Sequence, residues 1–164
     1  MKTQINSPQA MFEMGEKIGQ QLKPSDVLVL TGELGVGKTV FTQGIASAFN
    51  ILGVTSPTFV ISRIHKGNPN FIHIDAYRLL DSDPTTFSDL DFESYLSSSV
   101  FVIEWGKDFV STLTDQYLEV IISYGENESD RQVEFLPDGD RWSGFKLVST
   151  PCRFSIYLFL NCNC

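Results

Sequence analysis

The sequence has no long apolar run and few cysteines. No hydrophobic stretch approaches the ~20 residues that a membrane-spanning helix needs, and residues 1–17 lack the apolar segment of a secretory signal. Cys152, Cys162 and Cys164 all lie at the C-terminal end, a distribution that predicts free thiols rather than a disulfide framework or a zinc site. These absences predict a cytoplasmic protein with no membrane segment.

Positive charge is also scarce. Twelve Lys and Arg face twenty Asp and Glu, so the formal net charge is -8. A surface that grips nucleic acid needs clustered basic residues, and those of this chain are dispersed. We therefore expect any contact with nucleic acid to be indirect, through a basic partner, and the acidic surface to favour solubility.

The length of 164 residues suits one globular domain. Helical spacing of apolar residues predicts helices at 8–22 and 39–49, and a short helix is expected near 88–96. Apolar runs bounded by turn residues predict strands at 27–30, 59–64, 71–75, 100–104, 117–124 and 131–136. This order predicts an α/β fold of the P-loop type, with a largely parallel central sheet flanked by helices.

A glycine-rich segment lies between the strand at 27–30 and the helix at 39–49. Residues 32–39 match G-x-x-x-x-G-K-[ST] at every fixed position. Such glycines let main-chain N–H groups approach phosphate oxygens, while Lys38 supplies an ammonium and Thr39 a hydroxyl for Mg²⁺. The segment predicts a P-loop nucleoside triphosphatase that binds ATP with Mg²⁺. The expected nucleotide-binding residues are Gly32, Glu33, Leu34, Gly35, Val36, Gly37, Lys38, Thr39 and Val40.

Two apolar strands end in a carboxylate, at Asp75 and at Glu104. In an open parallel sheet the carboxyl ends of the strands line the ligand crevice, and a P-loop site needs an acid for the metal or its waters. We assign Glu104 to the metal and Asp75 to water positioning or proton acceptance, although the residues alone leave an exchange of roles open. His73 is interpreted as a strand histidine with a satisfied hydrogen bond.

The segment Ser56-Pro57-Thr58 follows the predicted P-loop helix. Pro57 restricts Ser56 to an extended conformation, which presents hydroxyl groups before the next strand. In other P-loop proteins a segment at this place senses the γ-phosphate. We expect residues 56–58 to close over that phosphate and count Thr58, with Lys38 and Asp75, among the catalytic residues; an ordinary Ser-Pro turn is the alternative.

Four motifs together resemble the bacterial TsaE (YjeE) family. They are G-x-L-G-x-G-K-T at 32–39, S-P-T-[FY] at 56–59, H-x-D-x-Y-R-L at 73–79 and I-E-W at 103–105. They occur in order, within a similarity that runs from about Thr3 to about Lys146. The resemblance implies the ATPase component of the system that makes threonylcarbamoyladenosine beside the tRNA anticodon, with ATP turnover resetting a complex of TsaD- and TsaB-like partners.

The resemblance also implies roles for single residues. Thr39 and Glu104 match Mg²⁺ ligands, Asp75 the catalytic acid and residues 56–58 the switch loop, with Trp105 beside the site. The chain departs from the family pattern in having Met11 where a Thr near the nucleotide is usual, and Asp91 where a Gly is common. Residues 147–164 match nothing in the family, so we divide the chain into an ATPase domain, 1–146, and a tail, 147–164, of unclear role.

Other P-loop functions fit the sequence less well. A GTPase needs an N-K-x-D guanine reader, and the nearest string, residues 105–108, lacks the Asn. A small-molecule kinase usually brings an Arg-rich lid, whereas only Arg78 lies near the motifs. An alternative from another class stays open: a nucleotide-gated binding module in which the ATP state controls partner docking and hydrolysis is incidental. For an ATPase, we expect slow turnover alone, because a partner completes the site.

Overall fold

The structure is a computed structural model that describes residues 1–57, 61–80 and 85–147. The strands are β1 (Lys2–Ile5), β2 (Val27–Thr31), β3 (Ser62–His65), β4 (Asn70–Asp75), β5 (Ser99–Glu104), β6 (Tyr117–Tyr124) and β7 (Arg131–Asp138). The α-helices are α1 (Pro8–Gly19), α2 (Lys38–Ser47) and α3 (Thr85–Ser88), and the 3-10 helices are η1 (Ala76–Leu79), η2 (Phe92–Ser98), η3 (Val110–Thr112) and η4 (Asp140–Trp142). None of the helices in the described ranges is long and apolar enough to cross a bilayer.

Within the described residues, one seven-stranded sheet has the order β1-β7-β6-β2-β5-β4-β3. The four central strands, β6, β2, β5 and β4, run parallel to one another. The outer pairs β1–β7, β6–β7 and β3–β4 are antiparallel. The predicted parallel core is therefore confirmed at the centre of an α/β fold, whereas its antiparallel edges were not predicted. The connections between β3 and β4 and between β6 and β7 are short, so these pairs must be antiparallel. Parallel neighbours need a crossover of a dozen residues or more.

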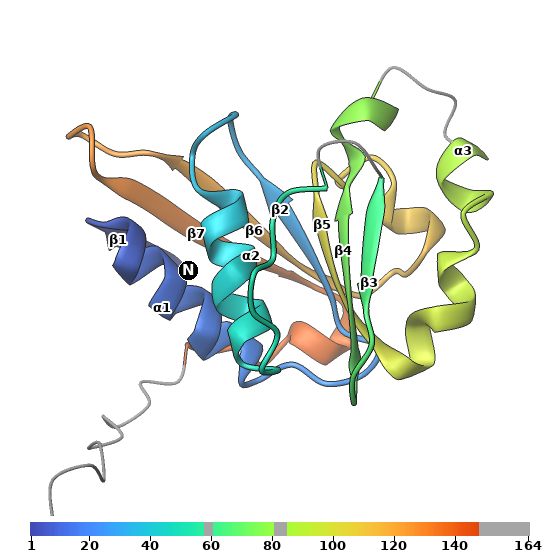
Figure 1. The fold of residues 1–164 in the computed structure, drawn as a ribbon. Coiled ribbons are helices and arrows are strands. Elements are labelled where there is room, and N and C mark those ends of the chain that lie inside the picture. The colour runs from blue at the N-terminus through green and yellow to red at the C-terminus, as the bar shows by residue number, and fades with distance from the viewer. Residues whose placement is uncertain (58–60, 81–84, 148–164) are drawn as a thin grey trace, which may run out of the picture.

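Helices cover both faces of the sheet (Figure 1), and each face carries its own core. Alternate residues of β2 point to opposite faces, as strand geometry requires: Leu28 and Leu30 pack under α1 and α2, while Val27 and Val29 pack in the second core. All four side chains are fully buried. The central strands are thus buried on both faces, which explains why they read as continuous apolar runs.

The helices α1 and α2 lie side by side over one face of the sheet (Figure 1). Ser7 caps α1 by accepting a 3.1 Å hydrogen bond from the main-chain N–H of Ala10. The two helices approach so closely that a Cβ at Gly15 would overlap the carbonyl oxygen of Phe41, and one at Gly44 that of Phe12. This close approach fixes the position of α2, whose first turn is the end of the glycine-rich loop.

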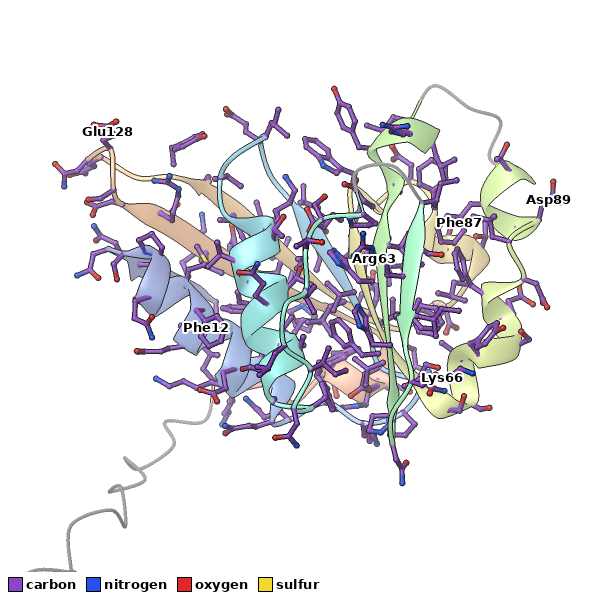
Figure 2. All side chains as sticks on the ribbon, viewed as in Figure 1. Phe12, Arg63, Lys66, Phe87, Asp89 and Glu128 are labelled. Carbon is purple, nitrogen blue, oxygen red and sulfur yellow. The ribbon has the colours of Figure 1, made fainter. Side chains whose placement is uncertain are left out.

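Two short helices, α3 and η2, cover the second face of the sheet where one helix was predicted at 88–96. The segment splits into α3 and η2, and Asp91 between them has a φ of 52°. A left-handed residue interrupts a helix, and glycine takes this conformation without the Cβ penalty that Asp incurs. Phe87 points from α3 toward the sheet while Asp89 points away from it (Figure 2), and the Phe87 ring stacks on Phe109 with centroids 5.5 Å apart.

The strand predicted at 59–64 is observed as β3, which begins at Ser62; residues 58–60 lie outside the described ranges. The strand β1 was not predicted. It is only four residues long, and Ile5 is its one buried residue. Residues 148–164 of the proposed tail also lie outside the described residues.

Candidate functional site

A cleft of about 600 Å³ opens where the parallel strands end. The loop between β2 and α2 forms one side of this cleft, and the ends of β4 and β5 form another. The lining residues are Leu34, Gly35, Gly37, Lys38, Thr39, Val40, Ser56, Pro57, Asp75, Tyr77, Arg78, Glu104 and Trp105. The crevice outside the carboxyl ends of the strands is where open α/β sheets bind ligands, and this one contains residues from all four sequence motifs.

The glycine-rich loop has the backbone conformations that its sequence predicts. Gly32, Gly35 and Gly37 have φ angles of 150°, 78° and 116°, which side-chain-bearing residues rarely adopt. Gly37 is also the N-cap of α2. The free N–H groups of the first helical turn therefore face the cleft end of the loop, and the helix dipole adds partial positive charge there. This arrangement suits an anion such as a phosphate group.

The side chain of Lys38 lies within the loop itself. Its Nζ donates hydrogen bonds to the carbonyl oxygens of Gly32 at 2.7 Å and Glu33 at 2.9 Å, and lies 4.0 Å from the ring centroid of Trp105. Only 4% of Lys38 is exposed. Burial lowers the pKa of Lys38, and the negative charges of Glu104 and Asp75 oppose that shift. The two predicted acids therefore act electrostatically on the predicted phosphate-binding lysine.

One oxygen of Glu104 contacts both Thr39, a predicted metal ligand, and His73, which was not predicted to belong to the site. The hydroxyl of Thr39 donates to Glu104 Oε1 at 3.3 Å, and Nε2 of His73 lies 3.0 Å from the same oxygen. His73 has the hydrogen bond that was expected of it, but its partner places it in the site rather than in an ordinary strand. Its Nδ1 is buried without a partner among the described residues. Glu104 Oε2 makes no hydrogen bond to any described residue, so one carboxylate oxygen at the cleft stays available.

The residues present fit a magnesium ion. Mg²⁺ prefers oxygen ligands in octahedral geometry at about 2.1 Å, so two neighbouring ligands lie about 3 Å apart. The Thr39 hydroxyl and Glu104 carboxylate oxygens are 3.3 Å apart. Asp75 occupies the register position beside Glu104 on the adjacent parallel strand. A hydroxyl and carboxylates at one cleft end match the donor set of a Mg²⁺–phosphate site that keeps several waters.

Asp75 connects the 56–58 segment to the strand ends. The hydroxyl of Ser56 donates to Asp75 Oδ2 at 3.0 Å, and the main-chain N–H of Tyr77 donates to Oδ1 at 3.1 Å. Ser56 and Asp75, each assigned from the sequence to the γ-phosphate end of the site, are therefore in direct contact. Thr58, the remaining residue predicted to be catalytic, lies outside the described residues.

The family described as "Threonylcarbamoyl adenosine biosynthesis protein TsaE" matches residues 5–133. The chain belongs to the TsaE family. It is 41% identical over 116 residues to "tRNA threonylcarbamoyladenosine biosynthesis protein TsaE" from Mycobacterium tuberculosis (strain CDC 1551 / Oshkosh), covering 65% of this chain and 69% of that protein. The TsaE of Streptomyces coelicolor is 39% identical over 140 residues, covering 81% of this chain and 94% of that protein.

A solved structure supports the same assignment. The "Crystal structure of Bacillus subtilus YdiB" superposes with a TM-score of 0.71 at 28% sequence identity, covering 87% of this chain and 88% of that one. The matched TsaE segment includes the glycine-rich loop and the ends of β4 and β5 that line the cleft. The resemblance recognised from the four motifs is therefore confirmed.

The strands β6 and β7 were predicted from the sequence, but the contact of their hairpin with the glycine-rich loop was not. Tyr124 donates through its hydroxyl to the carbonyl oxygen of Leu34 at 3.2 Å, and Arg131 Nε donates to that of Val36 at 2.9 Å. The Arg131 guanidinium also lies 4.5 Å from the Tyr124 ring centroid. No motif marks these two residues, because their role depends on how the hairpin packs.

A second hollow of about 230 Å³ lies beside the same loop. It shares Gly35, Gly37 and Val40 with the main cleft. Its other lining residues are Ser7, Pro8, Met11, Val36, Ser129 and Arg131. Met11, the departure from the TsaE pattern noted in the sequence, therefore lines a hollow that adjoins the glycine-rich loop.

Proposed function

We propose that this TsaE-family chain binds and hydrolyses ATP with Mg²⁺ in threonylcarbamoyladenosine biosynthesis. One observation carries the proposal: the loop at residues 32–39 opens onto the same cleft as Thr39, Glu104 and Asp75. A triphosphate cradle, oxygen ligands for a metal and a carboxylate for water are thereby brought within one site. The names of the relatives support the place of this chemistry in tRNA modification.

The β- and γ-phosphates bind to the main-chain amides of residues 35–39 and to the ammonium of Lys38. Glu33, Leu34 and Val40 complete the contact surface around them. Thr39 and Glu104 hold Mg²⁺, which neutralises charge on the phosphate oxygens when bound. The residues are fixed in place by α2 and by adjacent strands, so positioning and electrostatics supply most of the rate enhancement.

Asp75 orients the attacking water for hydrolysis. The water oxygen forms a bond to the γ-phosphorus as the bond to the β–γ bridging oxygen breaks, giving ADP and inorganic phosphate. The proton of the water passes to Asp75 and then to solvent. Each Asp75 oxygen accepts one hydrogen bond, Oδ2 from Ser56 and Oδ1 from Tyr77, and keeps a second lone pair that can accept from the attacking water. Competition between the Ser56 hydroxyl and the water for Asp75 supports slow turnover in the isolated protein.

The adenine base occupies the smaller hollow beside the loop. Its volume of about 230 Å³ and its lining by Pro8, Met11 and Val40 suit the faces of a flat aromatic ring. Met11 supplies a polarizable side chain that packs well on aromatic surfaces. The hollow shares loop residues with the phosphate site, so one nucleotide spans both.

The partners belong to the same modification system, as TsaD- and TsaB-like proteins, and tRNA is reached only through them. The chain acts in the cytoplasm. The acidic net charge of -8 supports indirect rather than direct contact with tRNA. A partner that moves the 56–58 segment controls turnover at Asp75.

The test measures phosphate release from ATP by the protein alone and in a mixture with the partner proteins and tRNA, alongside formation of the modified nucleoside. We expect slow release alone, faster release in the mixture, and loss of both readouts in Lys38→Ala. Asp89→Asn, a change to a carboxylate that points away from the sheet (Figure 2), serves as control and keeps both. Unchanged turnover in the mixture, with docking still dependent on ATP, would support the nucleotide-gated binding module instead.

A further inference from the structure

A buried carboxylate lies beneath the phosphate loop, outside the sets of residues considered so far. Glu119 is in the middle of β6, and only 6% of it is exposed. Its neighbours Leu118 and Val120 point into the core under α1 and α2, so Glu119 points to the opposite face. That face of the sheet is otherwise apolar near β2 and β5. A buried charge at such a position is unfavourable unless both oxygens are paired.

Each oxygen of Glu119 has one partner. Thr31 donates through its hydroxyl to Oε1 at 2.8 Å, and Lys107 donates through Nζ to Oε2 at 2.6 Å. Lys107 also donates to the hydroxyl of Tyr117 at 3.0 Å. Burial acts to lower the pKa of Lys107, but hydrogen bonds and charge interactions with Glu119 and Tyr117 outweigh it, so the pKa lies above the ordinary value. Lys107 is therefore charged at neutral pH.

The two partners of Glu119 are each close in the chain to one of the two sides of the cleft. Thr31 is the last residue of β2 and directly precedes Gly32 of the phosphate loop. Lys107 follows the segment that carries Glu104 and Trp105. That segment leaves β5 across the end of β2, where the N–H of Trp105 donates to Leu30 O at 3.1 Å and Trp105 has a φ of 61°. The hydrogen bond from Lys107 to Glu119 then links this segment to β6.

We propose that Glu119 is a positioning residue that holds the phosphate loop and the Glu104–Trp105 segment in fixed relation through Thr31 and Lys107. The inference rests on the proposed function, because it concerns the alignment of the proposed metal ligand with the loop. Glu119 itself does not line the cleft. It connects Thr31, which precedes the phosphate loop, to Lys107, which follows the Glu104–Trp105 segment. The connection lies on the sheet face opposite to α2.

The role predicts a specific kinetic signature. The loop's own amides, which bind the phosphates equally in the ground and transition states, stay intact when the network is broken. The alignment of Glu104 with those phosphates is lost. Breaking the network should therefore lower kcat about tenfold, the scale of one hydrogen bond to a charged group, and change KM for ATP by less than about threefold.

Three variants test the network without large changes in shape. Thr31→Val removes only the hydroxyl, Lys107→Met removes only the ammonium, and Glu119→Gln removes the charge. Lys107→Arg keeps a donor of the same charge and should recover most of kcat. Lys2→Met is the matched control, because Lys2 forms an exposed ion pair with Glu134 at the β1 edge of the sheet, two strands away from β6. Turnover is measured in the reconstituted mixture described above, with thermal unfolding of each variant in parallel.

We expect the double variant Thr31→Val/Lys107→Met to match Glu119→Gln rather than multiply the two single losses, because both act through one carboxylate. The lysine side chain is about half exposed, so Lys107→Met should fold even if Glu119→Gln does not. If the wild type hydrolyses ATP and both Thr31→Val and Lys107→Met keep the wild-type kcat, this inference is overturned while the proposed function stands. A kcat loss that only parallels a loss of folded protein would also overturn it. Absence of ATP binding by the wild type would instead overturn the proposed function, and the inference with it.

Discussion

The hydroxyl of Thr39 lies 3.3 Å from Glu104 Oε1, although 65 positions separate the two residues in the chain. The contact arises because β5 is the parallel neighbour of β2, with Leu30 in register with Glu104. The loop that follows β2 leads into α2, and Thr39 in the first turn of that helix contacts Glu104 at the end of β5. Sheet order thus brings a helix-start hydroxyl to a strand-end carboxylate, which is the pairing that a Mg²⁺–phosphate site requires.

The two acids should separate in function. Asp75→Asn is expected to retain ATP binding and to lose hydrolysis about a hundredfold or more, because a positioned acid–base group contributes on that scale. Glu104→Gln is expected to weaken the Mg²⁺ dependence of ATP binding. Titration of ATP with and without Mg²⁺, together with phosphate release, checks both. If Asp75→Asn loses the Mg²⁺ dependence and Glu104→Gln keeps it, the two roles are exchanged.

Close packing of α1 on α2 should make Gly44 intolerant of a side chain. A Cβ at Gly44 would overlap the carbonyl oxygen of Phe12, so Gly44→Ala must push the helices apart. We expect a loss of about 1–3 kcal/mol in the free energy of unfolding and a Tm lower by roughly 2–4 °C for each kcal/mol. Gly144→Ala is the control, because nothing lies within 4 Å of a Cβ there. Equal Tm values for the two variants would show that the helices are not packed as described.

Arg141 neutralises a buried carboxylate near the start of β2. It donates to Asp26 through Nε at 2.8 Å and through a terminal nitrogen at 2.7 Å, and Asp26 is only 2% exposed. Arg141→Met leaves the buried Asp26 carboxylate without its cationic partner, so we expect urea unfolding to show a free energy of unfolding lower by about 3 kcal/mol. Lys2→Met, at an exposed pair, should lose less than about 1 kcal/mol. Adding Asp26→Asn to Arg141→Met should restore part of the loss, and no restoration would argue against a buried charge as the cause.

Stability should fall in mild acid partly because of His65. Burial lowers the pKa of His65, and the nearby His73 and Arg63 lower it further. Its folded-state pKa thus lies below the value of about 6.5 expected in the unfolded chain. As the pH falls below about 6.5, the unfolded chain takes up a proton that the folded protein resists, so the free energy of unfolding decreases.

Urea unfolding at pH 7.5 and pH 5.5 checks this dependence. His65→Gln cannot titrate, so its stability should decrease less between the two pH values than that of the wild type. The comparison of differences removes the contributions of all other titrating groups that the two proteins share. An equal decrease in both proteins would show that His65 does not contribute.

The sequence was sufficient for what depends on local pattern. The loop glycines, α2 and the apolar strands ending at Asp75 and Glu104 follow from periodicity, turn residues and a motif whose spacing has a physical reason. The parallel order of the central strands follows from the strand–helix alternation. The meeting of these residues in one cleft follows from that order, because parallel strands end at one edge.

The features that sequence could not supply depend on tertiary packing. The pairing of His73 with Glu104 requires knowing that β4 and β5 are adjacent and in register. Glu119 resembles any exposed strand residue in an alternating pattern until Lys107 is seen to cover it. The break at Asp91 depends on a left-handed backbone angle that no apolar pattern reports.

Calorimetric titration of the wild-type protein with ATP at millimolar Mg²⁺, with Lys38→Ala titrated in parallel, tests triphosphate binding most directly. We expect a saturable heat with one site per chain for the wild type, and none for Lys38→Ala, whose phosphate-binding ammonium is gone. Absence of heat from the wild type, or equal binding by the two proteins, would contradict the claim that residues 32–39 hold a triphosphate.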